Sequence, residues 1–177
     1  MRLPKVRNNV WTFHGKGMNS YEVTQRNVRM ETTYEVRREE GEDLVSLLVG
    51  TEAILRLHES DRESPVIASL RMKSILTETN FELYDENEET IGAFEFPMFE
   101  FTKRCQLKLG SSVYAGEGGV RGRTFRFRNG EGELVLEIAK RRRLRDAYKV
   151  RISEEFPRNI GLLATGLIDQ KYFEGRG

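Results

Sequence analysis

The C-terminal stretch FPRNIGLLATGLIDQKYFEG, residues 156–175, is the feature that most constrains the fold of this 177-residue chain. It predicts a helix at about 159–174 whose apolar side chains surround the axis instead of forming one stripe. The apolar part, residues 160–173, is 14 residues long, whereas a bilayer-spanning helix needs about 20. We therefore expect this helix to be buried in protein. Gly161 and Gly166 each cost a helix about 1 kcal/mol relative to alanine, which indicates that neighbouring side chains approach its backbone closely.

Short stretches in which apolar and polar residues alternate occupy most of the preceding chain. They lie at 34–36, 54–57, 81–83, 124–128, 133–138 and 148–152. This period of two is typical of strands with one buried face, and the acidic or glycine-containing turns between them favour antiparallel neighbours. A curved sheet of this kind can wrap around the C-terminal helix, which fills a lumen too wide for strand side chains alone. The expected fold is mainly β: a closed antiparallel barrel around a buried hydrophobic helix.

A weak internal repeat runs through these strands. Tyr34-Glu-Val, Phe81-Glu-Leu and Phe125-Arg-Phe each begin a strand that leads into a polar turn and a second strand, at spacings of 47 and 44 residues. The last two copies extend into the basic segments TKRCQLKL and AKRRRLRDAYKVRI. We interpret them as two related units of one closed sheet, with coincidence in a strand-rich chain as the alternative. No segment resembles a linker, so we expect one domain over residues 1–177.

Charge is distributed unevenly along the chain. Residues 1–100 carry a net charge of −7, residues 101–151 of +9 and residues 152–177 of −1, although the whole chain is near neutral at +1. A basic segment of this kind can attract an anionic partner even when the whole molecule is almost uncharged. The single cysteine, Cys105, excludes an intramolecular disulfide, and the N-terminus lacks the apolar run of a signal peptide. These features favour a cytoplasmic protein without a transmembrane span.

The basic residues of the +9 segment are the candidate anion-binding or lipid-binding site. They are Lys103, Arg104, Arg121, Arg123, Arg126, Arg128, Lys140, Arg141, Arg142, Arg143 and Arg145. Arginine and lysine suit phosphate oxygens, and strand-connecting loops would leave many of these side chains exposed. If the repeat is real, the basic turn at residues 103–104 and the basic turn at residues 140–145 would lie at the same end of the barrel. The alternative is that these cations are solvated or pair with the acidic turns of residues 1–100. Nucleic acid is a weaker alternative, because no nucleic-acid-binding motif accompanies the charge.

Catalytic chemistry finds little support in the sequence. His14 and His58 have no nucleophile or metal-ligand pattern around them, and Cys105 has the setting of an ordinary strand thiol. The segment GEGGVRGR, residues 116–123, lacks the Gly-Lys-Ser/Thr ending of a phosphate loop and is expected to be a flexible hairpin loop. Asp169 needs a hydrogen-bond partner if it is buried, and we expect it to bond barrel backbone or to face solvent. We expect no catalytic residue, metal or cofactor.

The C-terminal third of the chain resembles two known families. Phe156-Pro157, Leu167-Ile168-Asp169 and Phe173-Glu174 are similar to the C-terminal helix segment of phospholipid scramblases. LEIAKRRRLRDAYKVRI resembles the strand, basic turn and strand of LURP-one-related proteins. Both families belong to the tubby C-terminal superfamily. The resemblance, most specific over residues 124–175, implies a closed antiparallel barrel of about 12 strands around the C-terminal helix.

The resemblance also implies a function. Tubby proteins bind phosphoinositides through lysine and arginine, so the resemblance implies the same chemistry here, without matched residues. The chain lacks the proline-rich and cysteine-rich segments of animal scramblases, and their acidic segment is reduced to residues 153–155, so neither calcium-activated scrambling nor anchoring by acylation is expected. The leading hypothesis is a non-enzymatic peripheral module for anionic phospholipid or phosphoinositide head groups. The alternatives are a protein-binding scaffold and, third, an enzyme acting on phospholipid or nucleotide.

Overall fold

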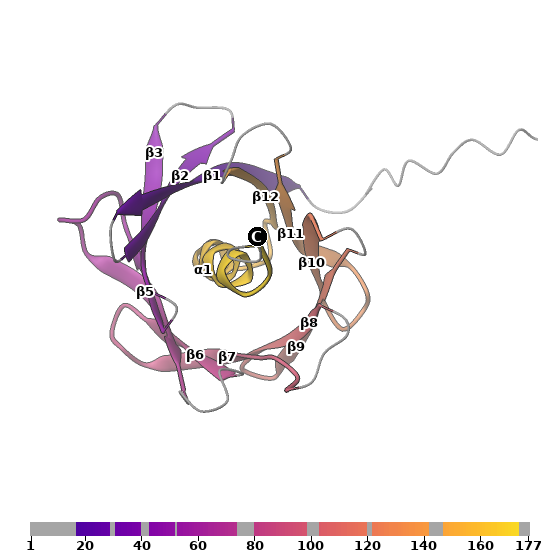
Figure 1. The fold of residues 1–177 in the computed structure, drawn as a ribbon. Helices are drawn as coiled ribbons and strands as arrows, with labels where there is room; N and C mark the ends of the chain where they lie inside the picture. Colours follow the sequence, from indigo (N-terminus) through magenta and orange to yellow (C-terminus); the bar gives the residue numbers. More distant parts are fainter. Residues whose placement is uncertain are drawn as a thin grey trace, which may run out of the picture.

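Twelve antiparallel strands close into a barrel in the computed structural model (Figure 1), which describes residues 17–28, 31–39, 43–51, 53–73, 80–98, 103–119, 122–141 and 147–173. The strands are β1 (Met18–Val28), β2 (Glu31–Arg38), β3 (Leu44–Gly50), β4 (Ile54–His58), β5 (Val66–Met72), β6 (Asn80–Asp85), β7 (Thr90–Glu95), β8 (Arg104–Leu109), β9 (Ser112–Gly118), β10 (Thr124–Arg128), β11 (Leu134–Lys140) and β12 (Ala147–Ser153). Each strand pairs with its neighbours in sequence, and β12 returns to pair with β1. The expectation of a closed antiparallel barrel is confirmed.

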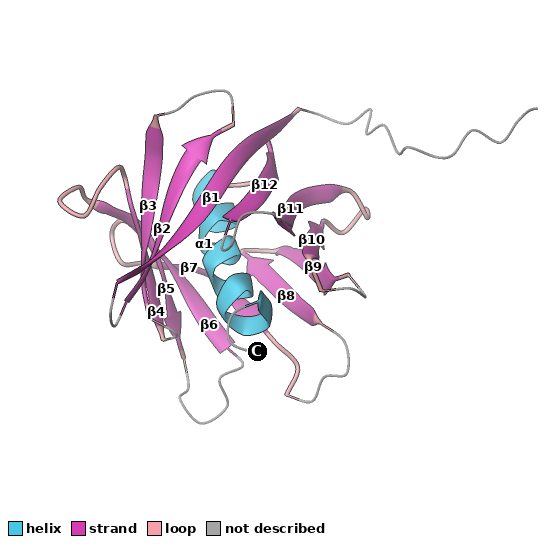
Figure 2. Ribbon diagram, turned by 45° about the horizontal axis from the view of Figure 1, so that its top comes forward, coloured by secondary structure: helices cyan, strands magenta, loops and turns pink. Residues whose placement is uncertain are grey.

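The C-terminal helix runs along the barrel axis (Figure 2). It comprises α1 (Arg158–Ile168) followed by a π-helical turn, η1 (Asp169–Phe173). Every residue from 160 to 168 is buried, as expected for a helix that is apolar on all sides. The observed bounds agree with the predicted 159–174, except that residue 174 lies outside the described residues. The lumen is therefore filled by this helix and by the inward-facing side chains of the strands.

Two helical glycines allow the helix to sit this close to the wall. A Cβ added at Gly161 would lie 2.7 Å from Ile152 Cδ1, and one added at Gly166 would lie 2.5 Å from Leu48 Cδ2. Both distances are shorter than ordinary van der Waals contact. The close approach that these glycines predicted is thus present on two sides of the helix, against β12 and β3.

The antiparallel order gives the barrel two distinct ends. The helix begins at the end where β12 finishes, which we call the start end, and its last turn reaches the opposite end, which we call the exit end (Figure 2). Connections that leave β2, β4, β6, β8 and β10 lie at the start end, and those that leave β1, β3, β5, β7, β9 and β11 lie at the exit end. The connections before β8 and after β11, which adjoin the two basic segments, therefore share the exit end, as predicted.

The three copies of the sequence repeat fall at corresponding places in the barrel. Tyr34 lies in β2, Phe81 in β6 and Phe125 in β10, so successive copies are four strands apart. All three side chains are fully buried, and all three strands begin at the exit end. Four-strand spacing around a twelve-strand barrel fits three units, where the sequence alone suggested two.

One local prediction is wrong. Residues 116–123 were expected to form a hairpin loop, but residues 116–118 belong to β9. Gly116 is buried, and a Cβ at this position would lie 2.7 Å from Phe127 Cε1 and 2.8 Å from both Cys105 Sγ and Phe125 Cε1. Glycine is used here so that two aromatic rings and a thiol can reach the strand, and of the predicted loop only residues 119, 122 and 123 are described outside the strands.

A candidate anion-binding site at the exit end

The predicted basic residues separate into three sets. Lys103, Arg123 and Lys140 lie at the exit end of the barrel, around the last turn of the helix. Other predicted residues lie on the outer wall, where most of them pair with carboxylates. These are Arg104, Arg126, Arg128 and Arg141. The remainder, Arg121, Arg142, Arg143 and Arg145, lie outside the described residues.

Lys103 and Lys140 continue the inward-facing rows of their strands. Lys103 is two residues before buried Cys105 in β8, and Lys140 is two residues after buried Ile138 in β11. Since side chains alternate between the two faces of a strand, both lysines are directed to the inside of the barrel mouth. Their Nζ atoms lie over aromatic rings, that of Lys103 5.4 Å from the Phe173 ring centre and that of Lys140 5.9 Å from the Tyr148 ring centre.

Arg123 lies directly before β10, beside Lys140. Its carbonyl oxygen accepts a 2.8 Å hydrogen bond from the Lys140 amide, which extends the β10–β11 ladder to the mouth. Among the described residues, no carboxylate lies within ion-pair distance of Lys103, Arg123 or Lys140. We call these three residues the mouth cations. Three positive charges that have no acidic partner in the described part of the chain form a surface that suits a multivalent anion.

Glycines beside Lys103 give its side chain room. The amide of Gly118 donates a 2.8 Å hydrogen bond to the Lys103 carbonyl oxygen, and a Cβ at Gly118 would lie 2.6 Å from Lys103 Cβ. A Cβ at Gly122, whose φ is +69°, would lie 2.9 Å from Lys103 Nζ. The glycine-rich connection after β9 thus takes part in the site by leaving space for the ammonium group, although it is not a phosphate loop.

Aromatic side chains from the wall and the last helical turn form the floor of the mouth. Tyr172 stacks on Phe125 with ring centres 5.5 Å apart and an interplanar angle of 16°, and its hydroxyl donates to the Arg104 carbonyl oxygen at 3.2 Å. Phe173 packs on Tyr148 at 5.8 Å. Tyr172 also contacts Lys103, whose Nζ lies 5.7 Å from the Tyr172 ring centre, a role not predicted from the sequence. The signal was the aromatic pair that ends the oily helix.

Asp169 fixes this last turn to the barrel. The carboxylate is buried and accepts hydrogen bonds from the Tyr34 hydroxyl at 2.7 Å and from the Tyr148 hydroxyl. The expectation that Asp169 faces solvent is wrong, and the partners seen here are side-chain hydroxyls of β2 and β12. A charge-assisted bond from each hydroxyl holds the helix end at a defined depth and rotation in the lumen.

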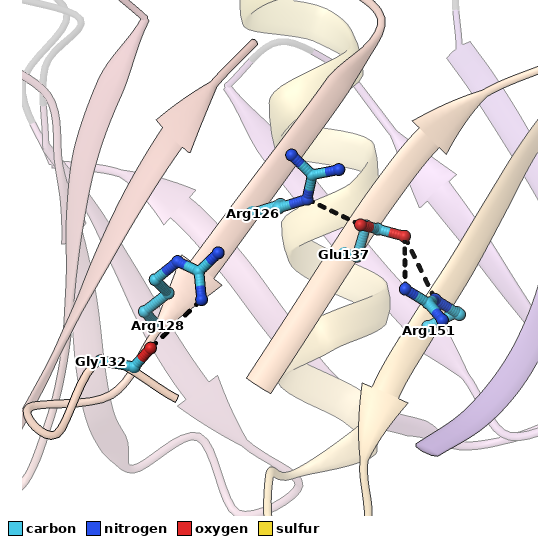
Figure 3. Close-up of polar contacts among 5 residues, drawn as sticks. All are labelled: Arg126, Arg128, Gly132, Glu137 and Arg151. Carbon is cyan, nitrogen blue, oxygen red and sulfur yellow. Dashed lines mark hydrogen bonds and ion pairs between the residues drawn. The ribbon is translucent and has the colours of Figure 1, made fainter. Parts of the chain in front are cut away.

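The outer-wall arginines are neutralised by ion pairs. Arg126 Nε lies 2.7 Å from Glu137, and Arg151 Nη2 lies 2.9 Å from the second oxygen of the same carboxylate (Figure 3). Burial alone would raise the pKa of Glu137, but the hydrogen bonds and positive charges of Arg126 and Arg151 outweigh burial and hold its pKa below the usual value. Arg128 instead donates to the Gly132 carbonyl oxygen, at the start end.

Two further arginines of the predicted site also have acidic partners. Arg141 lies 3.2 Å from Glu22 and 3.8 Å from Glu39, and Arg104 lies 3.8 Å from Glu117. A hydrogen bond from Lys149 is the largest of the effects that lower the pKa of Glu39. Pairing with acidic residues of the first 100, which the alternative predicted, is seen for Arg141, whereas the partners of Arg104 and Arg126 are Glu117 and Glu137 of the basic segment itself. Anion binding by the mouth cations stays a prediction.

The other residues considered for catalysis or metal binding show no sign of either role in the described part of the chain. Cys105 is a buried strand thiol, as predicted, and His58 Nδ1 lies 3.0 Å from the Ser64 carbonyl oxygen in a turn. His14 lies outside the described residues. In the part of the chain that the structure describes, no group of three or more histidine, cysteine, aspartate or glutamate side chains is arranged to hold a metal ion. The helices described there are too short or too polar to cross a membrane.

Comparison with known proteins does not assign the chain to a family. A scan against protein-family models and a search of curated proteins both find no match for the chain.

Proposed function

We propose that the protein is a non-enzymatic binding module for the phosphate groups of anionic phospholipids or phosphoinositides, acting at the cytoplasmic surface of a membrane. The observation that carries the proposal is the convergence of the three mouth cations, Lys103, Arg123 and Lys140, at one end of the barrel without acidic partners among the described residues. The sequence resemblance to LURP-one-related proteins and scramblases, in the tubby C-terminal superfamily, supports the same class of ligand.

The setting of the mouth cations favours phosphate binding over simple solvation. Lys103 and Lys140 are partly buried, and the Nζ atom of each lies over an aromatic ring, which limits the motion of the side chain. Ordering of this kind lowers the entropy lost when a ligand binds. The wall arginines, by contrast, would have to break existing ion pairs with Glu137, Glu22 or Glu117 before they could bind phosphate.

The expected size of the effect follows from the charge. A cation near an anionic membrane contributes about 1 kcal/mol, so replacing Lys103 and Lys140 by alanine removes about 2 kcal/mol, or about 30-fold in binding. The contribution should fall as salt screens the charges. The matched control is Arg56→Ala with Arg128→Ala, which removes the same charge from the outer wall and the start end.

The test is sedimentation of purified protein with neutral, phosphatidylserine and phosphoinositide vesicles at two salt concentrations. We expect binding to anionic vesicles, weakened by salt, about 30-fold weaker in the Lys103→Ala, Lys140→Ala variant and nearly unchanged in the control. Competition by a soluble inositol polyphosphate would identify the phosphate group rather than the lipid as the ligand. Failure of the wild-type protein to bind any anionic vesicle would refute the proposal and leave the protein-binding scaffold as the better hypothesis.

A further inference from the structure

The two ends of the barrel differ in charge. Apart from Arg62, the charged residues that the structure describes in the start-end connections are acids. They are Glu39, Asp43, Glu59, Asp61, Glu63, Glu86, Glu88, Glu89, Glu131, Glu133, Glu154 and Glu155. The charged residues described in the exit-end connections are cations: Lys73, Lys103, Arg123 and Arg141. Lys73 pairs with Glu82, and Arg141 reaches Glu22 and Glu39, so Lys103 and Arg123 account for the positive charge at this end. The described residues of the exit-end connections therefore favour an anionic surface, and those of the start-end connections oppose one.

Exposed apolar side chains add a second difference. Met98 is 67% exposed at the exit end, in the connection that leaves β7, and Pro97 beside it is also exposed. The other large apolar side chains exposed in the described part of the chain, Ile91 at 36% and Val113 at 47%, lie at the start end. The most exposed apolar side chain is thus on the basic end, which is the combination that membrane-surface segments use.

The apolar tip is anchored to the same aromatic floor as the mouth cations. Phe96, next to Pro97, is buried; its ring packs edge-on against Phe81 with ring centres 5.9 Å apart and lies tilted against Tyr172 at 6.0 Å. A groove of about 680 Å³ beside this tip is lined by Pro97, Met98, Arg104 and neighbouring residues of β8 and β9. The anchor fixes Met98 relative to the mouth cations, so both would meet one surface together.

We propose that the barrel docks end-on on an anionic bilayer, exit end first, with Pro97 and Met98 entering the membrane interface while the mouth cations bind lipid phosphates. This inference rests on the proposed function. In this orientation the acidic start end faces away from the membrane, which minimises repulsion. Side-on docking would bring the ion-paired outer wall to the lipid.

The experiment measures the environment of both ends directly. Met98→Cys and, as the matched control, Val113→Cys are each labelled with an environment-sensitive fluorophore and mixed with phosphatidylserine or phosphoinositide vesicles. Wild-type protein treated in the same way reports any labelling of buried Cys105. We expect a blue shift, and quenching by lipid-borne quenchers, at position 98 and neither at position 113.

Unlabelled neutral variants give an independent measurement. Met98→Asn should weaken binding to anionic vesicles about fivefold, because an apolar side chain no longer enters the interface, whereas Val113→Asn should leave it unchanged. Thermal unfolding of both variants shows whether folding is preserved.

The outcomes separate this inference from the proposed function. A shift at position 98 together with weaker binding by Met98→Asn supports end-on insertion. Vesicle binding that depends on Lys103 and Lys140, but with no shift at 98, overturns insertion and leaves head-group binding intact. A shift at 113 instead of 98 overturns the orientation. No vesicle binding refutes the proposed function and this inference with it, and a shift at 98 on adding a protein extract alone would assign the tip to a protein partner.

Discussion

Replacing Gly116 by alanine tests whether the packing beneath the exit end requires a bare backbone. The new Cβ would lie 2.7 Å from Phe127 Cε1 and 2.8 Å from both Phe125 Cε1 and Cys105 Sγ. Contacts of this kind normally begin at 3.4 Å, so each neighbour must move by more than half an ångström. The two phenylalanines are fully buried and pack on each other at 5.3 Å, which leaves the rings little space to retreat.

The magnitude follows from two opposing effects. Overpacking a well-filled core costs about 1–3 kcal/mol, and the upper part of that range applies because rings on two sides are displaced. Replacing glycine by alanine in a strand recovers about 0.5–1 kcal/mol of conformational entropy. The expected net loss is about 2 kcal/mol in the free energy of unfolding, or about 4–8 °C in Tm for a chain of this size.

Urea denaturation followed by circular dichroism measures this loss. Gly130→Ala is the control, because a Cβ at that position meets no atom within 4 Å and its unfolding free energy should be unchanged or slightly higher. Adding Phe127→Leu to Gly116→Ala should cost less than adding it to the wild type, since a smaller side chain relieves the contact. Equal stability of Gly116→Ala and Gly130→Ala would refute the packing argument.

Two other perturbations test the polar contacts. Asp169→Ala should lower the unfolding free energy by about 2–4 kcal/mol, because two buried tyrosine hydroxyls lose their acceptor. Tyr34→Phe should then cost less stability in the Asp169→Ala variant than in the wild type. Additive losses of unfolding free energy, measured by urea denaturation, would contradict the contact. Glu137→Gln should cost about 1–2 kcal/mol at neutral pH. Folding lowers the pKa of Glu137, so the stabilisation by this carboxylate is present above the usual value of 4.5 and is lost as pH falls through the lower folded pKa. The unfolding free energies of the wild type and the Glu137→Gln variant should therefore differ at pH 7 and converge in acid.

The barrel and its central helix could be predicted from local pattern. A helix with apolar side chains on every face needs a surrounding wall, and the alternating strands before it supply one. Gly161 and Gly166 also indicated where side chains of the wall approach the backbone of the helix. These signals are local in sequence, so they do not depend on knowing which strand pairs with which.

The pairing of the basic residues could not be predicted in the same way. Whether Arg126 is neutralised depends on Glu137, which the β10–β11 register places directly opposite it. Arg141 meets Glu22 only because the barrel closes β12 against β1, across most of the chain. Charge composition identified the basic segment but not which members lack acidic partners. The inward direction of Lys103 and Lys140 was, however, available from the strand period, two residues from Cys105 and Ile138.

Predicting the partners of Asp169 failed for a related reason. A buried carboxylate demands donors, but the sequence does not state which side chains reach the end of the lumen. Tyr34 and Tyr148 come from opposite ends of the chain and become neighbours of Asp169 only in the closed barrel. The loop prediction based on four glycines failed at Gly116 for a more local reason, since this residue lies in β9 and faces Phe125 and Phe127 of the next strand.

The four-strand spacing of the repeat explains why the proposed site occupies one side of the mouth. Tyr34, Phe81 and Phe125 take equivalent places, yet Tyr34 bonds Asp169 to anchor the helix, whereas Phe125 stacks under Tyr172 as part of the floor. The connection after β3, residues 51–53, carries no lysine or arginine, whereas its counterparts after β7 and β11 adjoin Lys103 and Lys140. Anchoring of the helix is shared by Tyr34 of the first unit and Tyr148 of the last, while cations adjoin the second and third units. If the mouth binds anions, adding a lysine at residue 51 should strengthen binding less than removing Lys103 weakens it, because residue 51 lacks the aromatic support that positions Lys103.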